Sequence, residues 1–252
     1  MTMTVLVVGA TGSIGRHVVA ESLRRGFTTR ALVRRISHDL PEEAEIVLGD
    51  LTSARDLGAA VDGVDAIVFT QGSHGGAAEA ERVDYGAVRN VLQALGARQA
   101  RIALMTTIGV TKHTPGHDWK RRGERLVRAS GRPYTIVRPG WFDYNDPDQL
   151  RLVMLQGDRR WASDPSDGVV SRAQIAQVLV ASLTSSAAQR KTLELVAEEG
   201  PATTDLDALF ATLDPDAPGH LDAVLDRDNM TVSEEPASVL ADLRQETSRA
   251  ET

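Results

Sequence analysis

The stretch VLVVGATGSIGRHVVAE, residues 5–21, decides the fold. Its first four residues are apolar and predict a buried strand, and the residues after the last glycine open a helix. Between the two, Gly9, Gly12 and Gly15 form the pattern GxxGxxG. Glycines at these places allow a tight turn, a bare backbone against an anion and close helix–strand packing, with the N-terminus of the helix facing the anion. The stretch therefore predicts a pyrophosphate-binding loop, rather than a purely structural turn, at the start of an α/β fold.

The rest of the chain alternates short β-branched runs with amphipathic stretches, which is typical of βαβ units and a parallel sheet. The predicted strands are 4–9, 28–34, 44–49, 65–70, 100–107, 134–139 and 192–197. The predicted helices lie near 13–25, 53–61, 79–96, 117–130 and 171–185. We expect loops over 141–170, which are rich in Asp, Pro and Gly. The predicted fold class is α/β: a doubly wound parallel sheet with a small, loop-rich C-terminal substrate lobe after about residue 141, and such sheets bind ligands beyond the carboxyl ends of their strands.

Composition sets further limits. The chain has 252 residues, 42% hydrophobic and 25% charged, which suits one large α/β domain or one domain with a small lobe. It has no cysteine, so a disulfide framework and a thiolate zinc site are excluded, and we expect no metal. The first residues read as a buried strand rather than a signal peptide, and no run approaches the roughly 18 apolar residues of a membrane span. We therefore expect a cytoplasmic protein with no membrane partner.

Charge is unevenly distributed along the chain. Residues 214–252 hold ten acids and three bases, which accounts for the whole net charge of −7. We therefore divide the chain into a dinucleotide-binding domain, 1–213, and an acidic C-terminal tail, 214–252, which we expect to be a solvated appendage with one or two short helices. A basic cluster is expected to form the outer face of one helix: Lys120, Arg121, Arg122, Arg125 and Arg128. No overall basic excess appears, so a nucleic-acid partner is not expected.

The end of the second predicted strand indicates which dinucleotide binds. A site for NAD places an acid there to hold the ribose 2′-hydroxyl. Here the sequence is RALVRRISHD, residues 30–39, with Arg34 and Arg35 at that place and Asp39 farther on. A guanidinium can hold a 2′-phosphate through two hydrogen bonds, whereas an acid would repel it. The pair predicts NADP(H) as the cofactor, and the alternative is a solvated arginine pair in a surface loop.

Five motifs together carry a family resemblance: GATGSIG (9–15), GDLTSARDL (49–57), TTIGV (106–110), KRRGERLVRASGRPYTIVRPGW (120–141) and VSRAQIAQVL (170–179). With them the chain resembles the extended and atypical short-chain dehydrogenase/reductases, including the NmrA-like branch, over residues 4 to about 197. The resemblance implies a Rossmann fold, with Asp50 and Leu51 against the adenine and residues 70–72 lining the nearer ribose. The expected cofactor-binding residues are Gly9, Thr11, Gly12, Ser13, Ile14, Gly15, Arg34, Arg35, Asp50, Leu51, Thr70, Gly72, Lys120, Pro139, Gly140 and Trp141.

The proton-donating part of the family's site is incomplete in this sequence. In the wider family a serine or threonine polarises the carbonyl, a tyrosine gives the proton, and a lysine four residues later lowers the pKa of the tyrosine. Thr106 or Thr107 can stand for the hydroxyl, and Lys120 matches the lysine. Gly116 stands where the tyrosine is expected. Without its partner, Lys120 can still bind the ribose or a phosphate of the cofactor, or it is one more basic residue on a basic helix face.

Other side chains are candidates for the substrate pocket. Trp141 and Phe142 can form a flat apolar wall for a planar substrate, although core packing explains them equally well. Tyr144 and His117 can enter the pocket, and neither has a spacing that would let Lys120 tune it. The remaining two tyrosines fit structural positions better than the role of a replacement acid. Tyr85 lies on a predicted helix, and Tyr134 begins a predicted core strand. The proton donor therefore stays open.

Three functions fit these residues. The first is an NADPH-dependent reductase for a planar conjugated acceptor, such as a quinone, a flavin or a polyaromatic ketone, because hydride addition there gives a delocalised anion that needs no strong acid. The second is an NmrA-like redox sensor that binds NADP(H), contacts a protein partner and performs no chemistry. The third, ranked last, is an isomerase or epimerase, because such relatives usually keep the tyrosine. The resemblance implies a monomer or a homodimer.

Overall fold

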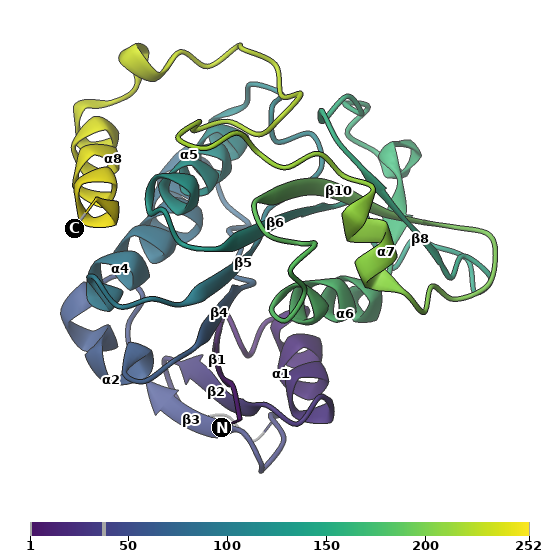
Figure 1. The fold of residues 1–252 in the computed structure, drawn as a ribbon, viewed down its shortest axis with the longest axis horizontal. Helices are drawn as coiled ribbons and strands as arrows, with labels where there is room; N and C mark the ends of the chain where they lie inside the picture. The colour runs from purple at the N-terminus through teal and green to yellow at the C-terminus, as the bar shows by residue number, and fades with distance from the viewer. Residues whose placement is uncertain (1, 37–38, 252) are drawn as a thin grey trace.

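The protein is built on a central, mostly parallel sheet (Figure 1). The computed structural model describes residues 2–36 and 39–251. The parallel strands run in the order β3-β2-β1-β4-β5-β6-β10. Their bounds are β1 Thr4–Val8, β2 Thr28–Val33, β3 Glu45–Leu48, β4 Ala66–Phe69, β5 Arg101–Met105, β6 Tyr134–Pro139 and β10 Lys191–Glu198. This order places the carboxyl ends of β1 and β4 side by side, where the chain reverses its direction across the sheet.

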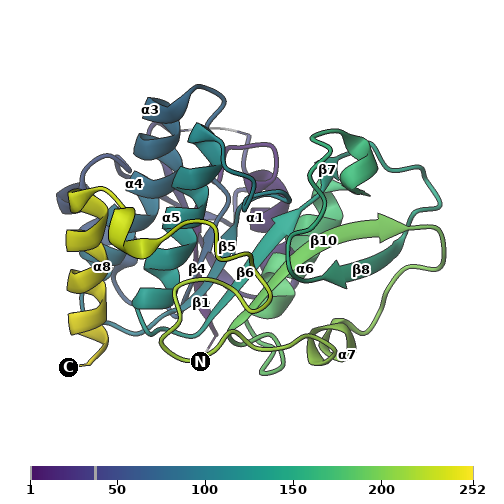
Figure 2. The same ribbon diagram turned by 90° about the horizontal axis from the view of Figure 1, so that it is seen from above.

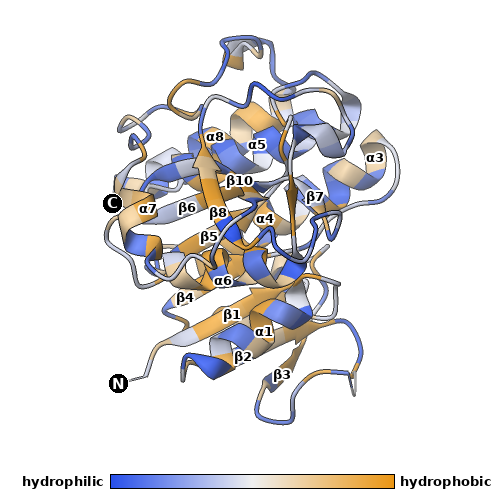
Figure 3. Cartoon of the chain, turned by 90° about the vertical axis from the view of Figure 1, so that its right-hand side faces the viewer, coloured by the Kyte–Doolittle hydropathy of each residue, from blue (hydrophilic) through white to orange (hydrophobic). Residues whose placement is uncertain are grey.

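Helices cover both faces of the sheet because its strands are apolar on both sides (Figure 3). Val5 and Val7 of β1 pack against α1 (Gly15–Arg24) and α6 (Arg172–Ser182). Leu6 and Val8 face the opposite layer. That layer holds α2 (Gly58–Val61), α4 (Gly86–Leu95), α5 (Pro115–Ala129) and α8 (Ala237–Ala250). The predicted doubly wound α/β fold is confirmed.

Every predicted strand and helix has a counterpart, with differences at the edges. The predicted helix 53–61 is a 3-10 turn (Ala54–Leu57) followed by α2. The helix predicted near 79–96 begins with α3 (Ala77–Ala80) and passes through a π-helical turn (Glu81–Tyr85) before α4. The remaining helical elements are α7 (Leu206–Ala211) and the 3-10 turns Pro165–Asp167 and Val232–Glu234.

The segment predicted as loops, 141–170, also contains three strands. They are β7 (Trp141–Phe142), β8 (Arg151–Leu155) and β9 (Val169–Val170). β8 and β9 pair antiparallel with β10, and β7 pairs with β9. The segment predicted to form a substrate lobe therefore extends the sheet, to the side of α6 (Figure 2).

The expectation of a solvated acidic tail is wrong. The segment after residue 213 runs back over α5 and ends in α8, which lies beside α5 (Figure 2). Arg125 of α5 is fully buried and pairs with Asp222 and Glu235, each at 2.7 Å. Arg128 pairs with Asp216 at 3.2 Å. The basic face of α5 is therefore largely an internal contact surface, because acids of the C-terminal segment neutralise it.

Across the described ranges 2–36 and 39–251, no helix combines the length and the apolar character that crossing a membrane requires.

Candidate active site

Two cavities adjoin each other beyond the carboxyl ends of the strands. The first, the glycine-loop cleft, has a volume of about 440 Å³ and is lined by residues that follow β1, β2, β3 and β4. The second, the aromatic cavity, has a volume of about 480 Å³ and is lined by residues after β5, by β7 and by residues 161–172. Phe142 lines both. A ligand lying in the cleft can therefore meet a second molecule in the aromatic cavity at Phe142.

The glycine-loop cleft gathers most of the predicted cofactor-binding residues. Those that line it are Gly9, Thr11, Gly12, Ser13, Ile14, Arg34, Asp50, Leu51, Thr70 and Gly72. The six others do not line it: Gly15, Arg35, Lys120, Pro139, Gly140 and Trp141. The geometry brings the first group together, and their contact with a cofactor stays a prediction.

The glycines of the loop are required by close backbone contacts. Gly9 has a φ of +83°, and a Cβ there would lie 2.7 Å from the backbone nitrogen of Gln71. A Cβ on Gly15 would lie 2.0 Å from the carbonyl oxygen of Gly9, so Gly15 serves the packing of the helix on the loop. The first turn of α1 contains no acid. The bare loop and the N-terminus of α1 therefore fit the pyrophosphate of a dinucleotide.

Basic side chains stand at the far end of this cleft. Arg34 is exposed and lines the cleft beside Asp50. Asp50 accepts a hydrogen bond from the backbone of Thr52 at 2.9 Å, and this bond, with the nearby charges of Arg34 and Arg82, lowers the pKa of its carboxyl. Arg82, which lies in the π-helical turn, also lines the cleft and was missed by sequence reasoning. The cleft thus offers two guanidinium groups near Asp50.

Lys120 lies next to the cleft but is held by an acid. Its ammonium lies 2.7 Å from Oδ1 of Asp84, which is buried and also accepts the hydroxyl of Ser73 at 2.6 Å. Lys120 lines a small cavity of about 10 Å³ together with Gln71 and Met105, which line the cleft as well. Its ammonium is therefore near the cleft, with one of its hydrogen bonds directed to Asp84.

The two candidate hydroxyls have different surroundings. Thr106 is buried and donates its hydroxyl to Glu124 at 2.7 Å, so it is not available to a substrate. The prediction that Thr106 polarises a carbonyl is therefore contradicted. Thr107 lines the aromatic cavity, and its hydroxyl makes only a 3.2 Å contact with the carbonyl of Ile108. Of the two, Thr107 is the hydroxyl that a substrate can reach.

Glu124 is part of the buried charge network under the site. Arg138 contacts both of its carboxylate oxygens, at 3.0 and 2.7 Å, and Arg128 lies one helical turn away. Burial alone would raise the pKa of Glu124, but the charge and hydrogen bonds of Arg138 lower it to about 2. Glu124 therefore stays ionised and holds α5 to β6.

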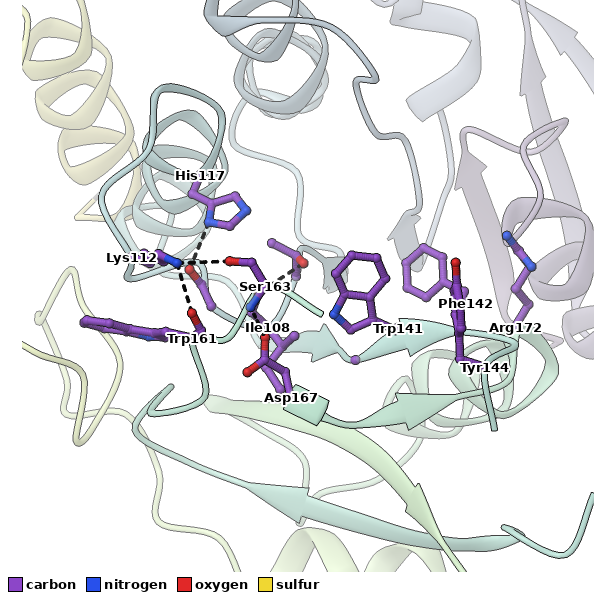
Figure 4. Close-up of a pocket in the computed structure, with 13 residues that line it drawn as sticks. Ile108, Lys112, His117, Trp141, Phe142, Tyr144, Trp161, Ser163, Asp167 and Arg172 are labelled. Carbon is purple, nitrogen blue, oxygen red and sulfur yellow. Dashed lines mark hydrogen bonds between the residues drawn. The ribbon is translucent and has the colours of Figure 1, made fainter. Parts of the chain in front are cut away.

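The aromatic cavity has an apolar wall at one end and polar groups at the other (Figure 4). Trp141 and Tyr144 meet edge to face, with ring centroids 5.9 Å apart, and Phe142 lies beside them. The predicted substrate residues Trp141, Phe142, Tyr144 and His117 all line this cavity. Gly140 lines it too, but a Cβ there would meet the carbonyl oxygen of Gly168 at 2.4 Å. The small size of Gly140 therefore serves this backbone contact.

His117 is positioned as a neutral ring. Its Nδ1 lies 2.9 Å from the carbonyl oxygen of Gly109, so Nδ1 carries the hydrogen and Nε2 is an acceptor. Burial lowers the pKa of His117. The loop that holds this carbonyl is fixed by buried Asp158, which accepts the backbone N–H groups of Gly109 at 2.6 Å and Thr111 at 2.7 Å. In this form His117 has no proton to give from Nε2.

Of the tyrosines within the described ranges, Tyr144 lines the aromatic cavity, and Tyr85 and Tyr134 do not replace the missing tyrosine. A Cβ built on Gly116 meets nothing within 4 Å. Tyr85 donates its hydroxyl to Asp242 at 2.7 Å, and Tyr134 donates to Asp216 at 2.9 Å. Burial first, and then these acids, raise the pKa of both tyrosines. Both are structural, and neither lines the aromatic cavity.

Sequence reasoning missed several residues of the aromatic cavity. They are Ile108, Gly109, Lys112, Trp161, Ser163, Asp167 and Arg172. Three of the seven lie in 141–170, the stretch predicted as loops, and three more lie between a predicted strand and a predicted helix, where no periodic pattern relates one residue to another. No group of three or more His, Asp or Glu side chains within 2–36 and 39–251 could hold a metal ion.

Comparison with known proteins places the chain in a family. A model of the NAD(P)H-binding family matches residues 9–186, well over half of the chain. An uncharacterized chloroplastic protein of Arabidopsis thaliana is 29% identical over 244 residues, which cover 82% of this chain and 74% of that protein. An uncharacterized sugar epimerase of Bacillus subtilis is 29% identical and covers 82% of this chain and 100% of its own length. The chloroplastic divinyl chlorophyllide a 8-vinyl-reductase of Oryza sativa subsp. indica is 37% identical over 174 residues, which are 60% of this chain and 42% of the rice protein.

Solved structures share the fold. A Bacillus halodurans protein assigned to the NAD-dependent epimerase/dehydratases superposes with a TM-score of 0.68 at 23% identity, over 84% of this chain and 100% of that one. A Streptococcus pneumoniae protein assigned as an NADH-flavin reductase superposes with a TM-score of 0.60 at 20% identity, over 78% of this chain and 100% of that one. At these identities the likeness shows the architecture.

Proposed function

The chain belongs to the NAD(P)H-binding family, and on that premise we propose that it is an NADPH-dependent reductase that transfers hydride to a planar conjugated acceptor. The family confirms the predicted resemblance to atypical short-chain dehydrogenase/reductases, a nicotinamide dinucleotide as cofactor, and an oxidoreductase. The acceptor and the preference for NADPH are the parts that we propose.

The observation that carries the proposal is the pairing of the two cavities. The aromatic cavity has the size range of a small-molecule site and is walled by Trp141, Phe142 and Tyr144. It shares Phe142 with the glycine-loop cleft, so a hydride donor in the cleft and an acceptor in the cavity would lie on either side of this residue. Flat aromatic side chains favour a flat conjugated partner through stacking.

The chemistry follows from the groups that are engaged elsewhere. NADPH supplies a hydride when bound. A simple ketone would then need a proton for its alkoxide. Gly116 offers none and His117 is a neutral acceptor, while Lys112 and Tyr144, which line the cavity, lack the tyrosine–lysine spacing with which the family tunes its acid. A quinone or a flavin needs less help, because the anion formed is delocalised and weakly basic. Thr107 can hydrogen-bond the acceptor's oxygen and orient it.

The preference for NADPH rests on the basic end of the cleft. Arg34 and Arg82 both line it, and Arg82 also lies 3.9 Å from a carboxylate oxygen of Glu79. Guanidinium groups favour a 2′-phosphate through charge and paired hydrogen bonds. The rice relative, whose name gives divinyl chlorophyllide a as the molecule it reduces, supports a conjugated acceptor. A relative and a structural neighbour are named as epimerases, and the test below distinguishes a reductase from an epimerase.

A sensor without turnover is the second candidate, and one observation favours it. The ammonium of Lys120 is bonded to Asp84, and the hydroxyl of Thr106 is bonded to Glu124. Two groups of the family's proton-transfer device are therefore engaged inside the protein. A sensor would bind NADP(H) and pass the signal to a protein partner.

The experiment is NADPH oxidation followed at 340 nm under anaerobic conditions. The panel comprises menadione, 9,10-phenanthrenequinone and FMN. Epimerisation consumes no cofactor, so it is tested separately by chromatography of a sugar nucleotide incubated with the protein and NADP⁺. We expect steady oxidation with at least one planar acceptor. Trp141→Ala should then raise the acceptor KM about tenfold and leave the NADPH Kd unchanged, because Trp141 lines the aromatic cavity alone. Tight NADPH binding without turnover on the whole panel would refute the reductase and favour the sensor.

A further inference from the structure

Lys112 stands at the polar end of the aromatic cavity, opposite the aromatic wall (Figure 4). Its ammonium donates to the carbonyl oxygen of Trp161 at 2.9 Å and to the hydroxyl of Ser163 at 3.0 Å. Both partners are neutral, and within the described ranges no carboxylate pairs with this ammonium. Because an ammonium has three hydrogens, one stays available for a ligand.

Two further donors line the same cavity with nothing to bond. Nε1 of Trp161 is buried and has no hydrogen-bond partner. Nε of Arg172 is buried and also lacks one, although another nitrogen of that guanidinium pairs with Asp143. A buried donor without a partner costs free energy, so such groups in a cavity wall indicate a ligand that accepts hydrogen bonds.

The acid in the wall is already engaged. Asp167 accepts the backbone N–H of Ala162 and that of Ser163, each at 2.7 Å. Asp143 is engaged with Arg172. The lining therefore presents hydrogen-bond donors at both ends: Lys112 and Trp161 at one end, and Arg172, which is paired with Asp143, beside Phe142 at the other (Figure 4).

We infer that the aromatic cavity takes a planar acceptor that carries an anionic group, a carboxylate or its chemical equivalent, placed against Lys112. This inference rests on the proposed function, since it treats the aromatic cavity as the acceptor site. The flat part of the ligand packs on Trp141 and Phe142, and the anion accepts from Lys112. Trp161, whose buried N–H has no hydrogen-bond partner, lies at the same end of the cavity as Lys112 (Figure 4).

The test uses a pair of redox-inert probes, so that binding is measured apart from turnover. These are 2-naphthoate and 2-naphthamide, which share one shape and differ in charge. Calorimetric titration is carried out with saturating NADP⁺. The NADP⁺ is to occupy the glycine-loop cleft and its cationic side chains, so that the probes do not bind there. The native protein should bind 2-naphthoate about tenfold more tightly than 2-naphthamide, the size expected for one partly exposed charge-assisted hydrogen bond.

Variants assign the preference to the ammonium. Lys112→Met keeps the aliphatic stem and should bind the two probes equally, while Lys112→Arg should keep a preference for the carboxylate. Ser163→Ala removes a neutral partner of Lys112 and should also keep the preference, which separates loss of charge from a shift of the loop. Each variant's thermal melting curve checks that it is folded.

Equal binding of both probes by the native protein overturns the inference, and so does a preference that survives in Lys112→Met. If neither probe binds while neutral quinones still oxidise NADPH, the inference fails and the proposed function stands. If the carboxylate preference is found but no acceptor of the panel turns over, the inference about the cavity stands and the reductase fails.

Discussion

Replacing Arg34 with alanine tests the basic end of the glycine-loop cleft. Arg34 lines the cleft, is exposed to solvent and lies close enough to Asp50 to lower the pKa of that carboxyl. A charge-assisted hydrogen bond contributes about 1.5–3 kcal/mol, and solvent exposure reduces it to roughly 1–2 kcal/mol. Since about 1.4 kcal/mol corresponds to a factor of ten, Arg34→Ala should weaken NADPH binding about tenfold. NADH lacks the 2′-phosphate and should lose less than about twofold.

The structure also supplies the matched control. Arg35 is also exposed but does not line the cleft, so Arg35→Ala should change the Kd of either cofactor by less than about twofold. Titration calorimetry with NADPH and with NADH, at low and at high salt, gives the four constants for each variant. The native preference for NADPH should shrink at high salt, because exposed charges are screened. An equal loss of both cofactors in Arg34→Ala, or a larger loss in Arg35→Ala, would refute the assignment.

Three further changes have distinct expected results. Gly116→Tyr, whose side chain enters open space, should speed reduction of a polyaromatic ketone about tenfold relative to Gly116→Phe and leave quinone reduction unchanged, measured at 340 nm; equal rates for the two variants count against a missing acid. Thr107→Val should lower kcat/KM about tenfold without loss of stability. Thr106→Val should lower the free energy of urea unfolding by about 1–3 kcal/mol, because Glu124 loses a hydrogen-bond donor. The reverse pattern would exchange the roles of the two threonines. Burial raises the pKa of Glu194 to about 8 from its ordinary 4.5. Between these two pH values the folded protein binds a proton that the unfolded chain lacks. The stabilisation from this proton is full below pH 4.5 and is lost as the pH rises through 8. Glu194→Gln should therefore lose less melting temperature than the native protein between pH 5 and 8, and an unchanged pH slope would contradict the assignment.

The parallel sheet could be predicted because its strands are buried on both faces. Runs such as VLVV in β1 and AIVF in β4 are apolar throughout and end at glycine or polar residues. β7, β8 and β9 could not be found in the same way. Two of them are two residues long, and β8 owes its place to its antiparallel pairing with β10. Pairing between distant segments leaves no local pattern.

The residues of the glycine-loop cleft could be predicted better than those of the aromatic cavity. The glycine loop and Arg34 are marked by their position directly after a strand, which a sequence shows. Lys112 and Trp161 meet only because residues 158–167 fold back on the loop after β5, held there by Asp158. For a related reason, the sequence predicts that the basic cluster on α5 faces solvent. A charged helix face looks the same in sequence whether water or the carboxylate of Asp222 covers it.

Some expectations stay predictions. They are the monomeric or dimeric state, the cytoplasmic location and the absence of a nucleic-acid partner. The Arabidopsis and rice relatives are named as chloroplastic, which leaves the location of this chain to direct measurement.

The most direct measurement of the central claim is a single turnover with stereospecifically deuterated NADPH. The protein with one equivalent of (4R)- or (4S)-[4-²H]NADPH is mixed anaerobically with menadione or FMN, and the absorbance at 340 nm is followed. Hydride transfer at the junction of the two cavities predicts complete loss of the absorbance, slowed by deuterium in one of the two stereoisomers and not in the other. Bound NADPH whose absorbance stays constant, or decays equally for both stereoisomers, would contradict a reductase.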